Sequence, residues 1–260
     1  MNIFVFVKRV PDTESKIRID HETNSIIEEG LSFVINPYDE YAVEEALRLK
    51  EAVESTVTVF SVGSDDTIPI LKKALAMGAD EAVLLKDELT ETYDGLRTAR
   101  ILVQALRTKY SDYNLLLFGK QSVGVDNSQV PSMVAELLGL PQVNVVTKLE
   151  IDGNAGSAYR EIEGAVEKVA FTLPAVISAQ KGLNEPRYET LRGIMAAKRK
   201  EIPVVEVENL GLDADQLAPT LELIKMESPP PREAGNVIEE EPDVAAKKIV
   251  EYLREEAKVL

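Results

Sequence analysis

Residues 1–140 alternate between short apolar runs and longer amphipathic segments, and this alternation limits the folds open to the chain. The apolar runs lack the sustained alternation of polar and apolar residues that is typical of a strand with one exposed face. They are therefore expected to be strands buried on both faces. These strands are Ile3–Val7, Thr56–Val62, Ala82–Leu85 and Leu115–Phe118. The amphipathic segments are expected to be helices, at Tyr38–Ala52, Ile68–Met77, Gly95–Lys109 and Gln129–Leu138.

Buried strands that alternate with helices predict an α/β fold with a doubly wound, mostly parallel sheet. In such sheets ligands bind at the carboxyl ends of the strands. The candidate site therefore combines Lys8–Asp12, Gly63–Asp66 and Gly119–Asp126.

The pattern changes from Asn144 onward. Antiparallel strands joined by tight turns are expected at Val145–Glu150, Ala158–Glu163 and Val166–Phe171. An apolar strand at Leu173–Ala179 and a short helix at Leu191–Ala197 are expected to follow. Residues 203–242 are rich in proline and acidic residues and lack periodicity, and an amphipathic helix is expected at Val244–Lys258. We therefore expect an α/β domain over residues 1–202 and an extended arm over residues 203–260.

Composition leaves few groups that could do chemistry. The chain has no Cys and one His, His21, which excludes thiolate chemistry and makes a triad or a two-His metal site untenable. No catalytic residue and no metal ligand is expected, so any redox chemistry must come from a bound cofactor. A net charge of −16 argues against nucleic acid or an anionic membrane surface as the main partner.

Two segments have the chemistry of a nucleotide site. Gly119–Gln129 follows a buried strand and leads into a helix, whose free N–H groups favour phosphate. Its hydroxyl and amide side chains can add hydrogen bonds, although it matches neither standard phosphate-loop pattern, and an ordinary strand-to-helix turn would look similar. Asn36-Pro37-Tyr38-Asp39 starts a helix, where Asn36 could present its amide to an adenine or a ribose. A third segment, Leu183–Tyr188, places a leucine in a polar loop, where it could anchor a partner.

Together these segments resemble the electron transfer flavoprotein beta subunit. The resemblance runs through Val7–Asp12, Asn36–Ala46, Ala74–Asp80, Gly119–Gln121 and Leu183–Tyr188 to Gly193–Lys198, in order and over nearly the whole chain. The stretch Leu-Asn-Glu-Pro-Arg-Tyr is the most specific part. The resemblance implies a Rossmann-like, adenine-nucleotide-binding fold in an electron carrier subunit rather than a stand-alone enzyme.

The resemblance also implies partners. An alpha subunit would hold the redox-active FAD near Tyr38, and the arm and last helix of this chain would pack on it. The heterodimer would pass electrons from flavin dehydrogenases of the acyl-CoA dehydrogenase type, as in fatty acid beta-oxidation, to a quinone oxidoreductase. The dehydrogenase would dock on Leu183, Asn184, Glu185, Pro186, Arg187 and Tyr188, with Leu183 as the anchor.

The beta subunit itself would bind AMP structurally. The implied contacts are Phe6, Asn36, Pro37, Tyr38, Asp39, Val62, Gly119, Lys120, Gln121, Ser122, Val123, Gly124, Val125, Asp126, Asn127, Ser128, Gln129 and Val130. Where many AMP-binding members have an acidic run after Gly-Lys-Gln, this chain has Ser122–Asp126. That departure leaves open the electron-bifurcating type, with NADH as donor and a second FAD in this pocket. A stress-type α/β protein that binds ATP is a further alternative, although the loop lacks a P-loop Lys-Ser/Thr pair.

The N-terminus begins directly with a strand-like run and has no basic segment before it. No apolar run approaches the roughly 20 residues that a bilayer span requires. We therefore expect a cytoplasmic protein with no direct membrane insertion.

Overall fold

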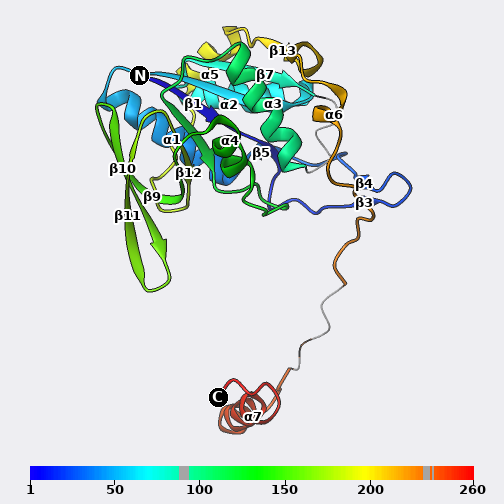
Figure 1. Cartoon of the computed structure of the whole chain (residues 1–260). Coiled ribbons are helices and arrows are strands. Elements are labelled where there is room, and N and C mark those ends of the chain that lie inside the picture. Colours follow the sequence, from blue (N-terminus) through cyan, green and yellow to red (C-terminus); the bar gives the residue numbers. More distant parts are fainter. Residues whose placement is uncertain (88–93, 231–234, 236) are drawn as a thin grey trace. The chain divides into compact units, whose positions relative to one another are not determined.

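A nine-stranded sheet organises the chain in a computed structural model that describes residues 1–87, 94–230, 235 and 237–260 (Figure 1). The strand order is β11-β10-β9-β12-β8-β1-β6-β7-β13. Its strands are β1 (Asn2–Phe6), β6 (Thr56–Gly63), β7 (Glu81–Lys86), β8 (Leu115–Gly119), β9 (Gln142–Asp152), β10 (Ala155–Ile162), β11 (Ala165–Thr172), β12 (Ala175–Ala179) and β13 (Val204–Glu206).

All neighbours from β9 to β13 in this order pair in parallel. The chain runs from β1 to β6 and β7 on one side and returns to β8 on the other side of β1. The order of connection therefore reverses between β1 and β8, and the crevice at such a reversal is where ligands bind in open α/β sheets. The mostly parallel, doubly wound sheet is confirmed.

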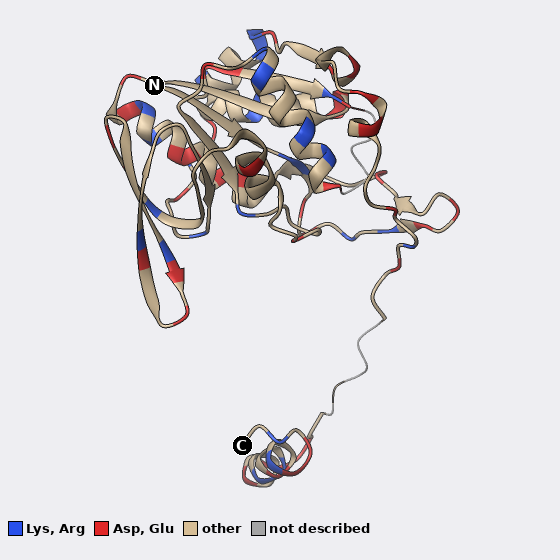
Figure 2. Cartoon of the chain, viewed as in Figure 1, with Lys and Arg blue, Asp and Glu red and all other residues tan. Residues whose placement is uncertain are grey.

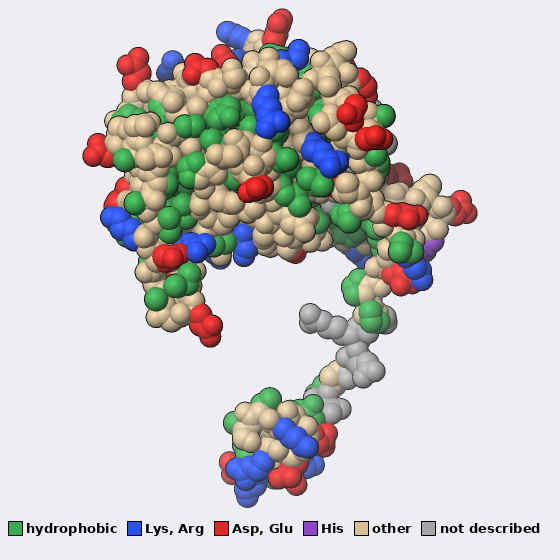
Figure 3. All heavy atoms as spheres, in the orientation of Figure 1, with side chains coloured by type: hydrophobic (Ala, Val, Ile, Leu, Met, Phe, Trp, Pro, Cys, Tyr) green, Lys and Arg blue, Asp and Glu red, His purple; other side chains and the backbone are tan. Residues whose placement is uncertain are grey.

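Helices cover both faces of the sheet because successive strand residues point to opposite sides. Ile3 and Val5 of β1 pack with the helices α1, α2 and α5, whereas Phe4 and Phe6 pack with α3 and α4. Figure 3 shows hydrophobic side chains gathered over the face on which α3 and α4 lie. The helices are α1 (Pro37–Ala52), α2 (Ile68–Met77), α3 (Gly95–Thr108), α4 (Val130–Leu138), α5 (Leu191–Arg199), α6 (Ala214–Leu217) and α7 (Pro242–Glu255).

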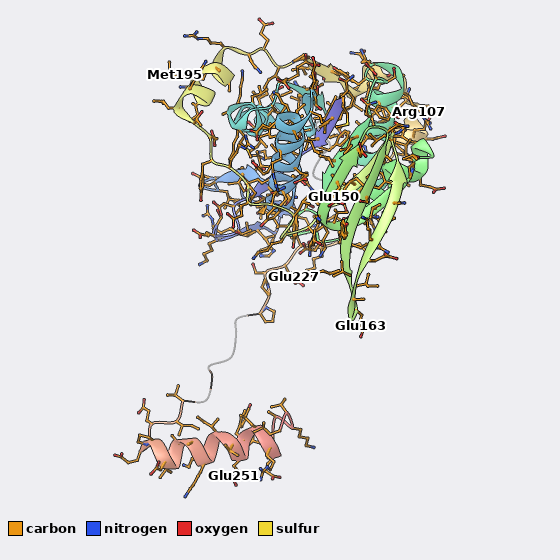
Figure 4. All side chains as sticks on the ribbon, turned by 90° about the vertical axis from the view of Figure 1, so that its left-hand side faces the viewer. Arg107, Glu150, Glu163, Met195, Glu227 and Glu251 are labelled. Carbon is orange, nitrogen blue, oxygen red and sulfur yellow. The ribbon has the colours of Figure 1, made fainter. Side chains whose placement is uncertain are left out.

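The strands β9, β10 and β11 form the expected antiparallel addition. Gly153 and Gly164 lie in the two turns with positive φ, as tight hairpins require. The ribbon extends beyond the rest of the sheet, with Glu163 at its tip and Glu150 on its surface (Figures 1 and 4). Acidic and basic residues lie beside each other on this ribbon, and Glu150 pairs with Lys148 at 2.7 Å (Figure 2).

Short elements complete the fold. Two small antiparallel pairs join β2 (Arg9–Pro11) to β5 (Phe33–Ile35) and β3 (Ile19–Asp20) to β4 (Ser25–Ile26). The exposed His21 directly follows β3. Short 3-10 helices lie at η1 (Asp65–Thr67) and η3 (Val207–Leu210).

The structure divides the chain into units of residues 1–226 and 227–260, rather than at residue 202. The difference arises because Val204–Glu206 add a strand to β7, and Val207 and Leu210 are buried against α3. The second unit contains α7, which has no buried residue within the described part of the chain. The packing of this unit on another chain stays a prediction. Among the described helices, none is long and apolar enough to cross a membrane.

Candidate functional site

A cavity opens where the strands β1, β6, β7 and β8 end. Its volume is about 930 Å³, counted with the open mouth. Segments far apart in the sequence line it, because parallel strands bring their carboxyl ends to one edge. The lining residues are Phe6, Val7, Lys8, Asn36, Asp39, Phe60, Ser61, Val62, Asp87, Asp94, Gly95, Arg97, Thr98, Leu102, Phe118, Gly119, Lys120, Gln121, Ser122, Val125, Asn127, Gln129, Val130 and Pro131.

Aromatic rings form one wall of this cavity. Phe6 and Phe118 are stacked with ring centroids 4.3 Å apart, and Phe6 and Phe60 are stacked at 5.5 Å. These rings are nearly buried by one another and by Leu102, so their arrangement is fixed by packing. A flat apolar group such as a purine base fits against a wall of this kind.

The loop from Gly119 to Val130 adds polar groups to the cavity lining. Its backbone turns back on itself, with positive φ at Gly124, Asp126 and Ser128, and the amide of Asp126 donates to the carbonyl of Ser122 at 3.0 Å. The helix α4 then begins at Val130, with Pro131 in its first turn. The free N–H groups and positive end of a helix favour an anion such as phosphate at this position.

Asn36 holds the loop to the start of α1. Its side-chain Nδ2 donates to the carbonyl of Gln121 at 2.8 Å, and its Oδ1 accepts the amide of Val123 at 3.1 Å. Asn36 therefore uses its amide to fix the loop backbone, and its contact with a base or ribose stays a prediction. Asn36 is 1% exposed, and its side chain makes no helix-cap hydrogen bond.

Asp39 joins α1 to the ends of two strands. Its Oδ2 accepts the amide of Lys8 at 2.7 Å, and its Oδ1 accepts the amide of Gly119 at 3.1 Å. Burial raises the pKa of the Asp39 carboxyl to about 7, against the opposing effect of these hydrogen bonds and of the Lys8 charge. The same burial lowers the pKa of Lys8.

The contact between Asp39 and the backbone of Gly119 requires that residue 119 has no side chain. A Cβ at Gly119 would lie 2.2 Å from Oδ1 of Asp39 and 2.6 Å from the backbone carbon of Tyr38. Gly119 therefore allows α1 to approach β8 closely. A Cβ added at Gly124 would meet no atom within 4 Å, so the space around it does not require glycine. Its φ of +88° explains the glycine there.

A buried ion pair on the α3 side of the cavity was missed by the sequence analysis. Asp87 follows β7 directly, and both oxygens of its carboxylate accept from the guanidinium of Arg97. Asp94 caps α3 by accepting the amides of Leu96 and Arg97 at 3.0 Å. The position of Asp87 in the sequence could have indicated it as a site residue. Asp87 lies at the carboxyl end of a strand of the parallel sheet, as Lys8 and Gly119 do.

Twelve of the residues implied as nucleotide contacts line this cavity. They are Phe6, Asn36, Asp39, Val62, Gly119, Lys120, Gln121, Ser122, Val125, Asn127, Gln129 and Val130. Those that do not line it are Pro37, Tyr38, Val123, Gly124, Asp126 and Ser128. Of the three strand ends expected to form the site, the second contributes Ser61 and Val62 instead of Gly63–Asp66, because the chain turns away into η1.

The segment Leu183–Tyr188 lies along α1. Arg187 donates from Nε and Nη2 to the buried carboxylate of Glu44 and from Nη1 to Glu51. The side-chain Nδ2 of Asn184 donates to the carbonyl of Tyr41 and to Glu45. These polar groups therefore hold the segment onto its own chain.

Leu183 is 7% exposed and packs in the core, so it is not the free side chain that the sequence suggested. The exposed apolar residue of the segment is Tyr188, at 94%. Leu191 and Met195 of α5, also exposed, were not singled out, although their spacing of four residues on one helix was a signal. Figure 4 shows Met195 at the surface of the molecule.

Comparison with known proteins adds to this geometry. Residues 23–210 match the family model described as the electron transfer flavoprotein domain. The chain belongs to the electron transfer flavoprotein family. It is 44% identical to the electron transfer flavoprotein subunit beta of Bacillus subtilis, over 100% of both chains. It is also 38% identical to that of Syntrophomonas wolfei (100% of this chain, 98% of the relative) and 37% identical to that of Mus musculus (95% and 96%).

Family membership and full-length similarity to beta subunits assign this chain to flavoprotein electron transport. The matched region contains every strand end that lines the cavity except β1. Within the described residues, no group of three or more His, Cys, Asp or Glu side chains is arranged to hold a metal ion. The candidate site of this electron transfer flavoprotein is therefore a cavity lined by aromatic rings, a polar loop and a helix terminus.

Proposed function

We propose that this chain is the beta subunit of a heterodimeric electron transfer flavoprotein and that its cavity binds AMP structurally. The observation that carries the proposal is that the stacked rings of Phe6, Phe60 and Phe118 and the start of α4 line one and the same cavity. An adenine base fits the aromatic wall, and a phosphate fits the helix terminus.

The polar residues between these two ends suit the rest of the nucleotide. Ser122 and Asn127 line the cavity from the loop, and their hydroxyl and amide groups are suited to ribose or phosphate oxygens. Lys8 and Lys120 line the same cavity and add positive charge. Asn36 keeps the loop in place through Gln121 and Val123.

The redox-active FAD belongs, in this proposal, to an alpha subunit and supplies the electron-transfer chemistry when bound. Tyr38 lies outside the cavity lining, beside Lys120, whose ammonium is 5.7 Å from the centre of the Tyr38 ring. Tyr38 would present this ring to the flavin. The arm after Met226 and the amphipathic helix α7 would pack on the alpha subunit, which accounts for the exposed Val244, Ile249 and Val250.

Electrons would pass from flavin dehydrogenases of the acyl-CoA dehydrogenase type to a quinone oxidoreductase. The dehydrogenase would dock on the 183–188 segment, where the contacts of Arg187 and Asn184 with α1 hold Tyr188 outward. Such pre-organisation lowers the entropic cost of docking. Leu183 would contribute from the core by supporting the segment.

A second candidate is the electron-bifurcating type, with NADH as donor and a second FAD in this cavity. The open mouth of the cavity favours it, and Gly124, Asp126 and Ser128 of the neighbouring loop are exposed. A dinucleotide could extend through that opening.

Co-purification with the alpha subunit, followed by denaturation and chromatography of the released nucleotides, tests the proposal. We expect one FAD and one AMP for each heterodimer. Two FAD molecules with no AMP would establish the second candidate instead. A heterodimer that releases FAD alone, at one per dimer, would show that this cavity holds no nucleotide and would overturn the AMP proposal.

A further inference from the structure

Asp39 is the one acidic side chain that contacts the ends of both strands at the reversal point of the sheet, among the described residues. Its two carboxylate oxygens accept the amides of Lys8, just after β1, and of Gly119, at the end of β8. Asp39 is 6% exposed and lies in the first turn of α1. A single side chain thus fixes the spacing of α1, β1 and β8, from which the cavity is built.

We propose that Asp39 is a positioning residue for the nucleotide: its ionised carboxylate holds the Lys8 and Gly119 amides in the binding geometry, and its protonation weakens nucleotide binding. The inference rests on the proposed nucleotide binding at this cavity. It assigns the carboxylate to the backbone of the site, and not to a direct contact with base, ribose or phosphate.

The geometry gives the reason. An ionised carboxylate is an acceptor only and satisfies both amides at once. A protonated carboxyl keeps one strong acceptor, its carbonyl oxygen, whereas its hydroxyl oxygen accepts from an N–H group more weakly than a carboxylate oxygen does. One strand end, at Lys8 or at Gly119, is then held less tightly. Because both residues line the cavity, this loosening changes its shape.

The charged groups around Asp39 can be followed element by element. Lys8 faces it from the end of β1 and favours the ionised form. From β8 the next residue is Lys120, whose ammonium lies near the Tyr38 ring. On α1 itself, Glu40 is paired with Lys73 of α2 at 2.8 Å. In the loop, Asp126 accepts from Gln121. Burial is the largest influence on Asp39 and raises its pKa to about 7, so its protonation state changes near neutral pH.

The test uses the full-length chain and measures its affinity for AMP between pH 5.5 and 8.5. We expect the dissociation constant of the wild type to rise about tenfold as the pH falls, the effect of losing one hydrogen bond to a charged group. The variant Asp39→Asn should bind weakly throughout and lack this change. The matched control is Glu40→Gln, on the same helix turn but outside the cavity lining, which should follow the wild type.

The phosphate of AMP also takes up a proton, with a second pKa of about 6. That change is shared by all three proteins, so the ratio of dissociation constants between Asp39→Asn and the wild type isolates Asp39. A ratio that does not vary with pH would overturn the proposal. Equal pH dependence in Asp39→Asn and Glu40→Gln would overturn it as well.

A second measurement does not depend on nucleotide binding or on the folding of a variant. In the ¹⁵N-labelled wild-type chain, the amide signals of Lys8 and Gly119 should shift together with a common midpoint near pH 7. Amides that do not titrate would overturn the positioning role. If the amides titrate but the wild type binds neither AMP nor FAD at any pH, the proposed function fails while the role of Asp39 in shaping the cavity stands.

Discussion

At the scale of single residues, the contacts of Gly119, Asp39 and Leu183 differ from those that their local sequence indicates. Gly119 starts the candidate nucleotide loop, and the space that a side chain would take there is occupied by Asp39 and Tyr38. Asp39 resembles an ordinary acidic residue at a helix start, yet it is buried and binds two strand ends. Leu183 sits in a polar stretch of sequence, yet it packs in the core. In each case the partner comes from a distant part of the chain.

Gly119→Ala should separate α1 from β8. Its Cβ would lie 2.2 Å from Oδ1 and 2.7 Å from the backbone nitrogen of Asp39, and backbone atoms cannot yield as a flexible side chain does. We expect a loss of about 1–3 kcal/mol in the free energy of unfolding, measured in urea, together with weaker AMP binding. Gly124→Ala is the comparison, since only its positive φ is strained, at about 1–2 kcal/mol. Equal AMP affinity in wild type and Gly119→Ala would contradict this reading.

Asp39 should also affect stability as a function of pH. Its pKa is about 7 in the folded chain and near 3.8 in the unfolded chain, so between these values the folded state holds the extra proton. The free energy of unfolding therefore falls as the pH rises from about 4 to about 7 and levels off above 7. Urea unfolding of the nucleotide-free chain should show this fall, and Asp39→Asn should lose it. A fall of the same size in Asp39→Asn would assign it to other groups.

Leu183→Ala and Tyr188→Ala should have different effects. Leu183 is in the core, so its truncation should cost about 2–5 kcal/mol of stability. Tyr188 is 94% exposed, so its truncation should leave stability within about 0.5 kcal/mol and slow electron transfer from the dehydrogenase. Thermal unfolding and stopped-flow kinetics of the heterodimer measure the two effects. Unchanged transfer rates at all dehydrogenase concentrations in Tyr188→Ala would exclude Tyr188 from docking.

At the scale of elements, α3 connects the cavity to the chain segment that precedes the arm. Its N-cap residue Asp94 accepts from the backbone and hydroxyl of Thr220. In its first turn, Nε of Arg97 donates to the carbonyl of Leu217 at 2.8 Å. Further along the helix, Gln104 donates to the carbonyl of Leu210. The α3 surface thus holds residues 210–220 on the domain, which explains why the compact unit continues past residue 202.

Arg97→Leu should loosen this attachment. It leaves the Asp87 carboxylate buried without its guanidinium partner, which we expect to cost about 3–5 kcal/mol. Hydrogen exchange should then increase in residues 214–220. Arg100→Leu is the control, because Arg100 also donates to this segment, at the carbonyl of Gln216, but does not line the cavity. Similar losses of unfolding free energy in both variants would show that the buried Asp87–Arg97 pair contributes no more to stability than the exposed contact of Arg100.

At the scale of the whole molecule, the chain consists of a domain with its own core and a C-terminal unit whose described residues form none. Residues 1–226 contain both hydrophobic clusters, whereas α7 exposes its apolar residues. A solvent-exposed amphipathic helix gains stability by burying its apolar stripe against another surface. The division therefore separates the domain proposed to bind a nucleotide from the unit proposed to bind the alpha subunit.

A chain truncated after Met226 should keep its fold and its nucleotide. Since the described residues after Met226 contribute nothing to the two hydrophobic clusters, we expect the midpoint of thermal unfolding to change by less than about 4 °C, equivalent to less than 1 kcal/mol. Assembly with the alpha subunit should be lost, as measured by gel filtration of the mixed subunits. Full assembly of the truncated chain would show that the arm is dispensable.

The layered α/β architecture, the antiparallel addition and the loop at the end of β8 were predictable from the sequence, because periodicity and turn residues are local properties. The family resemblance was also visible in the sequence, and the comparisons confirm it. The folded chain was needed to show that Asn36 binds the loop, that Leu183 is buried, that Asp87 and Arg97 line the cavity, and that Asp39 holds two strand ends. Each of these depends on contacts between residues distant in sequence, and a pattern along the chain does not record which distant backbone groups a side chain will meet.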